Sequence, residues 1–271
     1  MPEIDEISNI EELSKIEPDE LPSLNWRDTE NKFRQDLKYK YLPFRLYYKI
    51  RSYKYAKYRN PELNIIKDLV SKNQISIDVG ANLGLFTYFM ARHSKHVYAF
   101  EPNPYPLRNL KNVVDKNVTI LPIALGSSNG KANLKIPRNI KGWSSNGASL
   151  GDKDYGDGML FEVQCRKLDS LKIENIGLIK IDVEGFETDV LKGAENIIKK
   201  QKPTMIIENE TIYKKGSTNV LFEAMREYGY EKYICKQNKL EKFRNFSFEE
   251  HQKDPANKDL NYIQNFIFIK K

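Results

Sequence analysis

The feature that most constrains this chain is a β-branched run, residues 75–84, that ends in a glycine turn: Ile-Ser-Ile-Asp-Val-Gly-Ala-Asn-Leu-Gly. An amphipathic stretch over residues 85–92 follows at once. Glycine lets a backbone approach a ligand closely, and a helix N-terminus presents bare N–H groups to it. The order strand, glycine turn, helix therefore predicts an α/β fold with a nucleotide-type site at this turn.

A second apolar run, residues 97–100, ends in Glu101, 101 − 80 = 21 residues after Gly80. An acid at this distance, at the tip of the next strand, is placed to accept hydrogen bonds from ribose hydroxyls. Dinucleotide sites need glycine where this chain has Asn82, because the pyrophosphate approaches the backbone there. The pattern favours a ligand with ribose but no pyrophosphate, over a plain strand-to-helix turn.

Strand and helix patterns alternate along most of the chain, as in doubly wound α/β folds. We expect strands at 75–79, 97–100, 118–122, 178–183, 204–208, 230–236 and 262–269, and helices at 85–92, 105–114, 188–199 and 220–228. Residues 131–136 and 161–166 predict further extended segments that depart from this rhythm. The sheet is expected to be mostly parallel, with an antiparallel last strand.

Charge divides the N-terminal part of the chain. Residues 1–31 carry ten acids and two bases, whereas residues 32–59 carry ten bases and one acid. Such a change of sign indicates an organisational boundary. We therefore expect an acidic tail or arm at 1–26, a basic and aromatic helical extension at 27–70, and a catalytic-type domain at 71–271 with an insertion at about 130–166.

Two interpretations of the extension remain open. In the favoured interpretation, the tyrosines pack on the main domain and the lysines are solvated, because runs of charged residues usually form solvated faces. Otherwise residues 32–59 form a basic, aromatic surface for a phosphate-bearing or membrane-bound acceptor.

The insertion contains a loop of some 20 residues, 137–157, that is rich in Gly, Ser and Asn. Loops of this length are often active-site lids. The lid candidates are Gly142, Trp143, Ser144, Ser145, Asn146, Gly147 and Ser149, and a surface excursion is the equal alternative.

A second chemical centre is the segment Lys-Ile-Asp-Val-Glu-Gly at 180–185. Buried parallel strands normally read as continuous apolar runs, yet Lys180, Asp182 and Glu184 alternate here with apolar residues. Burying unpaired charge is costly, so we expect these side chains at the exposed C-terminal tip of the strand, beside the glycine turn. The alternative is a self-satisfied Lys180–Asp182 pair. Glu208 and Glu210 end the following strand.

Several short motifs, in this order, resemble the FkbM family of methyltransferases: Asp-Val-Gly-Ala-Asn-Leu-Gly (78–84), Phe-Glu-Pro-Asn-Pro (100–104), Ala-Leu-Gly (124–126), Leu-Asp (168–169), and Lys-Ile-Asp-Val-Glu-Gly with Glu187 and Leu-Lys-Gly-Ala (180–194). The resemblance runs from about residue 75 to 210. It implies a class I, Rossmann-like methyltransferase domain, S-adenosylmethionine as donor, and O-methylation of a hydroxyl, often on a sugar or polyketide.

The resemblance also implies site residues. Asp78, Gly80, Ala81, Asn82 and Gly84 would surround the methionine part of the cofactor, and Glu101, with Pro102 and Asn103, would hold the ribose. Ala124 and Leu125 would lie by the adenine, and Asp182 and Glu184 near the methyl group.

A hydroxyl acceptor has to lose its proton, which asks for a carboxylate within reach or for a metal that acidifies the hydroxyl. We expect Asp182 or Glu184 to be the base, with Lys180 orienting the acids. A divalent cation held by Asp182 and Glu208 is the alternative.

The expected acceptor is a sugar, a glycan or a lipid-linked compound. A nucleic-acid methyltransferase is disfavoured because no recognition motif accompanies the basic charge. A non-catalytic module that docks on a membrane or glycan assembly through residues 27–60 is the other alternative. An acidic N-terminus, two distant cysteines and no apolar stretch of about 18 residues favour the cytoplasm, with peripheral membrane contact considered.

Overall fold

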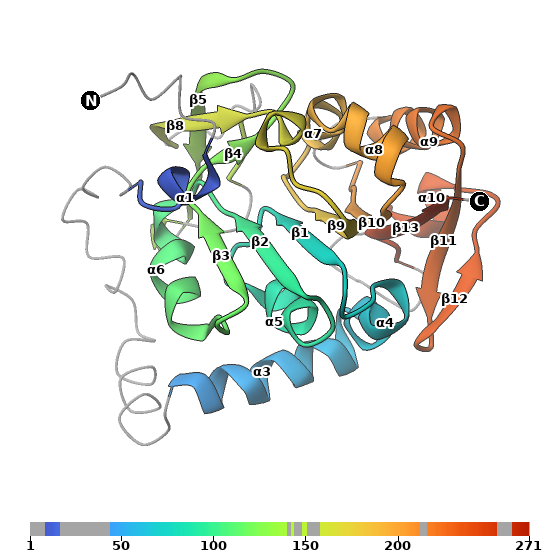
Figure 1. Cartoon of the computed structure of the whole chain (residues 1–271). Helices are drawn as coiled ribbons and strands as arrows, with labels where there is room; N and C mark the ends of the chain where they lie inside the picture. Colours follow the sequence, from blue (N-terminus) through green and yellow to red (C-terminus); the bar gives the residue numbers. More distant parts are fainter. Residues whose placement is uncertain are drawn as a thin grey trace.

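A twisted, mostly parallel sheet organises the molecule (Figure 1). The structure is a computed structural model that describes residues 9–16, 44–139, 142–143, 148–150, 158–211, 216–253 and 262–270. Within these ranges the sheet has the strand order β12-β11-β13-β10-β9-β1-β2-β3. Its strands are β1 (Ile75–Val79), β2 (His96–Phe100), β3 (Val118–Leu121), β9 (Ile176–Ile181), β10 (Thr204–Glu208), β11 (Tyr230–Lys236), β12 (Lys239–Lys242) and β13 (Asn265–Lys270). The predicted doubly wound α/β fold is confirmed.

Helices cover both faces of this sheet, with α7, α8 and α9 on one side and α3, α4 and α5 on the other (Figure 1). Their bounds are α3 (Phe44–Tyr58), α4 (Glu62–Leu69), α5 (Leu85–Ala91), α6 (Pro104–Val113), α7 (Glu187–Gly193), α8 (Glu195–Gln201) and α9 (Ser217–Glu227). The short helices α1 (Ile10–Leu13) and α10 (Phe248–His251) and a 3-10 turn (Leu168–Leu171) complete the described set. No helix in the described ranges has the length and apolarity needed to cross a bilayer.

Two apolar cores lie on the two faces of the sheet. Ile77 and Ile179 pack with α7 and α8, whereas Val97, Leu178 and Ile206 pack with α4 and α5. Successive strand residues point to opposite faces, so each central strand contributes to both cores. The continuous apolar runs that predicted the central strands are thus explained by burial on both sides.

The last strands form an antiparallel edge. β13 pairs antiparallel with both β10 and β11, which confirms the predicted antiparallel last strand. β12 pairs with β11 through a turn at Gln237 and Asn238, which have φ values of 50° and 61°. Positive φ at both turn residues is typical of a type I′ hairpin. The sequence prediction missed β12 because all four of its residues are exposed and carry no apolar alternation.

A second, smaller sheet has the order β4-β8-β5 and corresponds to the predicted extra segments at 131–136 and 161–166. Its strands are β4 (Ala124–Leu125), β5 (Gly130–Ile136) and β8 (Met159–Arg166). Leu134 and Ile136 are buried against Tyr105 of α6. Two further short strands, β6 (Arg138–Asn139) and β7 (Gly142–Trp143), pair with each other. The lid candidates Ser144 to Gly147 lie outside the described residues.

The helix α3 begins at Phe44, within the predicted helical extension, and packs on α5. The Tyr48 hydroxyl donates a hydrogen bond of 2.6 Å to the carbonyl of Leu83, and Tyr53 makes an edge contact with Phe89. These contacts agree with the interpretation in which tyrosines of the extension pack on the main domain. Residues 17–43 lie outside the description, so the predicted membrane contact through 32–59 stays a prediction.

The single helix predicted at 188–199 was wrong, because the structure has two helices, α7 and α8, that meet at Ala194. Gly193 approaches the backbone of Gly126 so closely that a Cβ atom would lie 1.9 Å from the Gly126 carbonyl oxygen. The helical periodicity of residues 188–199 gives no indication of this contact, because the contacting residue, Gly126, lies far away in the sequence, directly after β4.

The close contact between Gly80 and the backbone of Asp182 leads to a prediction about stability. Gly80 has a φ of +77°, and a Cβ there would lie 1.9 Å from the carbonyl oxygen of Asp182, whereas at Gly216, with a φ of +79°, a Cβ would meet no atom of the described residues within 4 Å. We expect Gly216→Ala to cost about 1 kcal/mol for backbone strain alone, and Gly80→Ala to cost roughly 3 kcal/mol because overlap adds to the strain. Urea unfolding of both variants measures the difference. Equal costs would contradict the close contact between β1 and the segment after β9.

Candidate active site

The glycine turn leaves the C-terminal end of β1 and is fixed by the neighbouring strand. The N–H groups of Gly80 and Ala81 both donate to the carbonyl of Phe100, at 2.9 and 3.0 Å. Asn82 has a φ of 48°, and Gly84, with a φ of 80°, is the residue before α5. Together with Gly80, whose φ is 77°, the turn therefore has left-handed backbone at three positions. Its hydrogen bonds to Phe100 hold it beside the C-terminal end of β2.

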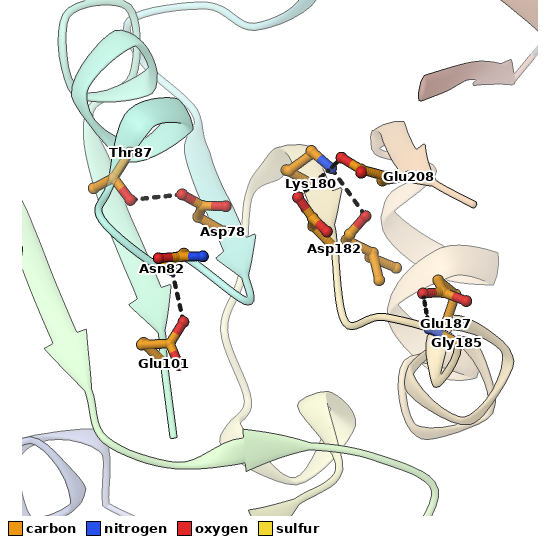
Figure 2. Close-up of polar contacts among 10 residues, drawn as sticks. Asp78, Asn82, Thr87, Glu101, Lys180, Asp182, Gly185, Glu187 and Glu208 are labelled. Carbon is orange, nitrogen blue, oxygen red and sulfur yellow. Dashed lines mark hydrogen bonds and ion pairs between the residues drawn. The ribbon is translucent and has the colours of Figure 1, made fainter. Parts of the chain in front are cut away.

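Glu101 is the side chain that meets this turn. Its two carboxylate oxygens accept the backbone N–H groups of Asn82, at 2.6 Å (Figure 2), and of Asn103, at 2.8 Å. Burial raises the pKa of Glu101 to about 7, although both hydrogen bonds favour the charged form. A carboxylate has about four lone-pair sites, so two acceptor positions remain for a ligand.

Asp78 lies at the base of the turn and is almost fully buried. The Thr87 hydroxyl on α5 donates to its carboxylate at 2.6 Å (Figure 2). Burial raises the pKa of Asp78 to about 6, against the effect of this hydrogen bond. Asp78 thus ties α5 to β1 and sets the direction in which the helix leaves the turn.

The second centre surrounds a buried cation. The Lys180 Nζ atom lies 3.5 Å from Asp182 Oδ2 and 3.8 Å from Glu208 Oε2 (Figure 2). Burial alone would lower the pKa of Lys180, but Asp182 and Glu208 raise it above its ordinary value. Burial, reinforced by the negative Asp182, raises the pKa of Glu208 well above its ordinary value.

The position expected for Lys180 was wrong. We predicted an exposed strand tip, yet its side chain is fully buried, while Asp182 keeps 31% of its side chain exposed. The physical reason is pairing, since two carboxylates at the ends of β9 and β10 compensate the buried ammonium. The ion pair named as the alternative is therefore present, and the same pair also faces the cavity described below.

The divalent cation considered as the alternative at Asp182 and Glu208 finds no support in the described ranges, where no group of three or more His, Cys, Asp or Glu side chains suits a metal. Lys180 already supplies positive charge to these two carboxylates.

The segment after β9 is held in an unusual conformation. Glu184 has a φ of 55° and is followed by Gly185 with a φ of 101°. The Gly185 N–H donates to Glu187 at 2.7 Å (Figure 2), and the Ser149 hydroxyl donates to the Glu184 carbonyl at 3.2 Å. A non-glycine residue at positive φ is strained and is often found at functional sites. These contacts connect the predicted lid segment, through Ser149, to the predicted base.

A cavity of about 1430 Å³ joins the two centres. This exceeds the 300–1,000 Å³ typical of small-molecule sites, so it has room for two ligands side by side. The sequence-predicted residues that line it are Asp78, Gly80, Ala81, Asn82, Glu101, Pro102, Ala124, Leu125, Ser149, Lys180, Asp182, Glu184, Glu208 and Glu210.

Two residues predicted to bind the cofactor do not line the cavity and instead support the local structure. Gly84 lies against Leu110, where a Cβ would approach to 2.3 Å. The Asn103 side chain caps α6 by accepting the Tyr105 N–H at 3.0 Å. Both therefore support the turn and the helix after β2.

A second set of lining residues lies outside the predicted site residues, although two of them, Arg51 and Tyr55, belong to the segment 32–59 that one interpretation assigned to an acceptor surface. Arg51 and Tyr55 of α3, Glu62 of α4, Lys236 of β11 and Asn265 of β13 all face the cavity. They are far apart in the chain, and only α3 carried a signal, its alternation of bases and aromatics.

Comparison with known proteins gives matches to methyltransferases. The family model described as "Methyltransferase FkbM domain" matches residues 78–232. Methyltransferase sdnD of Sordaria araneosa is 32% identical over 158 residues, which cover 45% of this chain and 61% of that protein. Hexuronic acid methyltransferase AglP of Haloferax volcanii is 25% identical over 168 residues, which cover 60% of this chain and 67% of that protein.

A solved structure of methyltransferase FkbM from Methylobacillus flagellatus KT is 16% identical, with a TM-score of 0.48, covering 73% of this chain and 44% of that chain. The family match is the informative finding, because residues 78–232 are more than half of the sequence and include both the glycine turn and the acid cluster. On this match, the chain belongs to the FkbM family of methyltransferases.

Proposed function

We propose that this protein transfers a methyl group from S-adenosylmethionine to a hydroxyl of a sugar. The observation that carries the proposal is the meeting of two centres in one cavity: the glycine turn with Glu101, and the carboxylates around Lys180. The first suits a ribose-bearing ligand, and the second suits deprotonation of a hydroxyl.

The residues at the turn fit S-adenosylmethionine. Glu101 keeps two acceptor positions after binding Asn82 and Asn103, enough for the two hydroxyls of a ribose. Asn82 in place of a glycine suits a ligand without a pyrophosphate. When bound, this donor supplies a methyl group on a positively charged sulfur. The nearby carboxylates of Asp182 and Glu184 would favour that charge electrostatically.

The chain's own task is to orient the acceptor and to take its proton. Methyl transfer needs little covalent help, so positioning supplies much of the rate. Asp182 and Glu184 are the proposed proton acceptors, because both line the cavity. Lys180 is the proposed positioning residue, since its ammonium lies between Asp182 and Glu208 and restrains both carboxylates.

A sugar is the proposed acceptor class. AglP, with 25% identity, is named for methylation of a hexuronic acid. Many polar groups line the cavity beside the carboxylates, which suits an acceptor with several hydroxyls.

The donor assignment predicts the behaviour of Glu101→Gln. Loss of charge-assisted hydrogen bonds should weaken binding of S-adenosylhomocysteine by about 1–3 kcal/mol, measured by calorimetry. Glu174→Gln, at an exposed carboxylate outside the cavity, is the control. Unchanged affinity in a folded Glu101→Gln protein would argue against ribose binding at this residue.

The base assignment predicts a split between binding and turnover. Glu184→Gln should bind S-adenosylhomocysteine as the parent protein does but transfer methyl groups roughly 100-fold more slowly, because general base catalysis contributes at least that much. Single-turnover transfer with labelled donor measures the rate. Parent-like turnover would remove Glu184 from the mechanism and leave Asp182 as the base.

The acceptor class and the role of metal are tested together. We expect labelled donor to mark glycans or lipid-linked sugars in fractionated cell extract, equally with and without a chelator, because Lys180 already supplies positive charge to Asp182 and Glu208. Label in nucleic acid alone would contradict the sugar assignment. Loss of label with the chelator would contradict the assignment of charge compensation to Lys180.

A further inference from the structure

The cavity is lined by two sets of side chains with opposite charge. Most of the acids come from the C-terminal ends of the strands β1, β2, β9 and β10, and two others, Glu62 and Glu250, come from helices. The lining Lys and Arg side chains besides Lys180 come from α3, the residue after it and β11: Arg51, Lys57, Arg59 and Lys236. The proposed methyl transfer uses the acids at the strand ends and Lys180. The basic set therefore needs its own explanation.

Contacts between α3, α4 and the β11–β12 turn hold the basic set together. The Asn64 side chain on α4 donates to the Ala56 carbonyl on α3 and to Asn238 in the turn, both at 2.9 Å. Lys236 and Arg59 are thus carried by elements that are tied to one another, although 177 residues separate them in the chain (236 − 59 = 177).

Arg51 and Tyr55 of α3 and Arg59, the residue after its end, follow one another at intervals of four residues. The guanidinium carbons of Arg51 and Arg59 lie 5.3 and 5.8 Å from the centre of the Tyr55 ring. A hydrogen bond from Arg51, with the positive charges nearby, lowers the pKa of Tyr55. In the described part of the chain, neither Arg59 nor Lys236 forms an ion pair with a carboxylate. Guanidinium groups bind carboxylate and phosphate with two parallel hydrogen bonds, so this face suits an anion.

Two buried polar atoms in the same cavity point to a ligand with hydroxyl groups. Glu62 is 6% exposed and Asn265 is 2% exposed, and both line the cavity. Among the described residues, Glu62 Oε2 and Asn265 Oδ1 have no hydrogen-bond partner. Buried polar atoms in native proteins are almost always hydrogen-bonded, so each indicates a donor group supplied by a ligand.

We propose that the acceptor is an anionic sugar, whose carboxylate or phosphate is bound by Arg59 and Arg51 beside Tyr55 and whose hydroxyls are bound by Glu62 and Asn265. This inference rests on the proposed function and specifies its substrate. The anion at the α3 end would orient the sugar so that another of its hydroxyls faces Asp182 and Glu184. A large polymer such as nucleic acid fits less well, because Glu62 and Asn265 are buried.

The test compares three probes of similar size: a nitrophenyl glucuronide, the matching glucoside and glucose 1-phosphate. We expect the parent protein, saturated with S-adenosylhomocysteine, to bind one or both anionic probes at least about tenfold more tightly than the glucoside. Arg59→Gln should remove most of that preference, and Arg51→Gln/Arg59→Gln should abolish it. Glucuronide against glucose 1-phosphate distinguishes carboxylate from phosphate.

The matched controls are Lys54→Gln and Lys49→Gln/Lys54→Gln, which remove the same charge from exposed positions of α3 outside the cavity lining. They should keep the preference for the anion. Equal binding of charged and neutral probes, or equal loss in the arginine and lysine variants, would overturn the proposal.

Failure of this inference is separable from failure of the proposed function. Binding of S-adenosylhomocysteine with no binding of any probe would overturn the anionic-sugar site and leave the donor site intact. Absence of S-adenosylhomocysteine binding would instead overturn the proposed function itself.

Discussion

The buried ammonium of Lys180 is the interaction on which the rest of the site depends. A charged amine with no solvent exposure is tolerated only because Asp182 and Glu208 lie within 4 Å of it. Those carboxylates end adjacent parallel strands, so the ion cluster fixes how β9 and β10 terminate relative to each other. Asp182 in turn donates its N–H to the Val79 carbonyl at 3.0 Å, which ties the cluster to the strand before the glycine turn. A disturbance at Lys180 would therefore reach both halves of the site.

The electrostatics of the cavity follow from this arrangement. Acids accumulate where the strands end, and burial raises the pKa values of Asp78 and Glu101 to about 6 and 7. Another part of the lining is basic and aromatic and comes largely from α3, which is anchored by the hydrogen bond from Tyr48 to Leu83 in the glycine turn. One cavity thus combines a wall suited to a cation with a wall suited to an anion.

The sequence predicted the parts of this picture that depend on local patterns. The strand at 75–79 was predicted with the bounds that the structure has, because the β-branched residues that form it and the glycine that ends it are local features of the sequence. Glu101 was brought to the turn as expected, since parallel strands end at one edge. The burial of Lys180 was missed because it depends on Glu208, 28 residues further on (208 − 180 = 28). The contributions of Glu62 and Asn265 to the cavity depend on how α4 packs against β13, and no periodicity in the sequence encodes that. The break between α7 and α8 was missed for a similar reason, a contact with Gly126 across the fold.

A crystal structure of the protein with S-adenosylhomocysteine tests the central claim most directly. The account predicts the ribose hydroxyls within hydrogen-bond distance of the Glu101 carboxylate and the sulfur atom facing Asp182 and Glu184 across the cavity. A nucleoside bound in another cavity, or a sulfur atom turned away from these carboxylates, would contradict it.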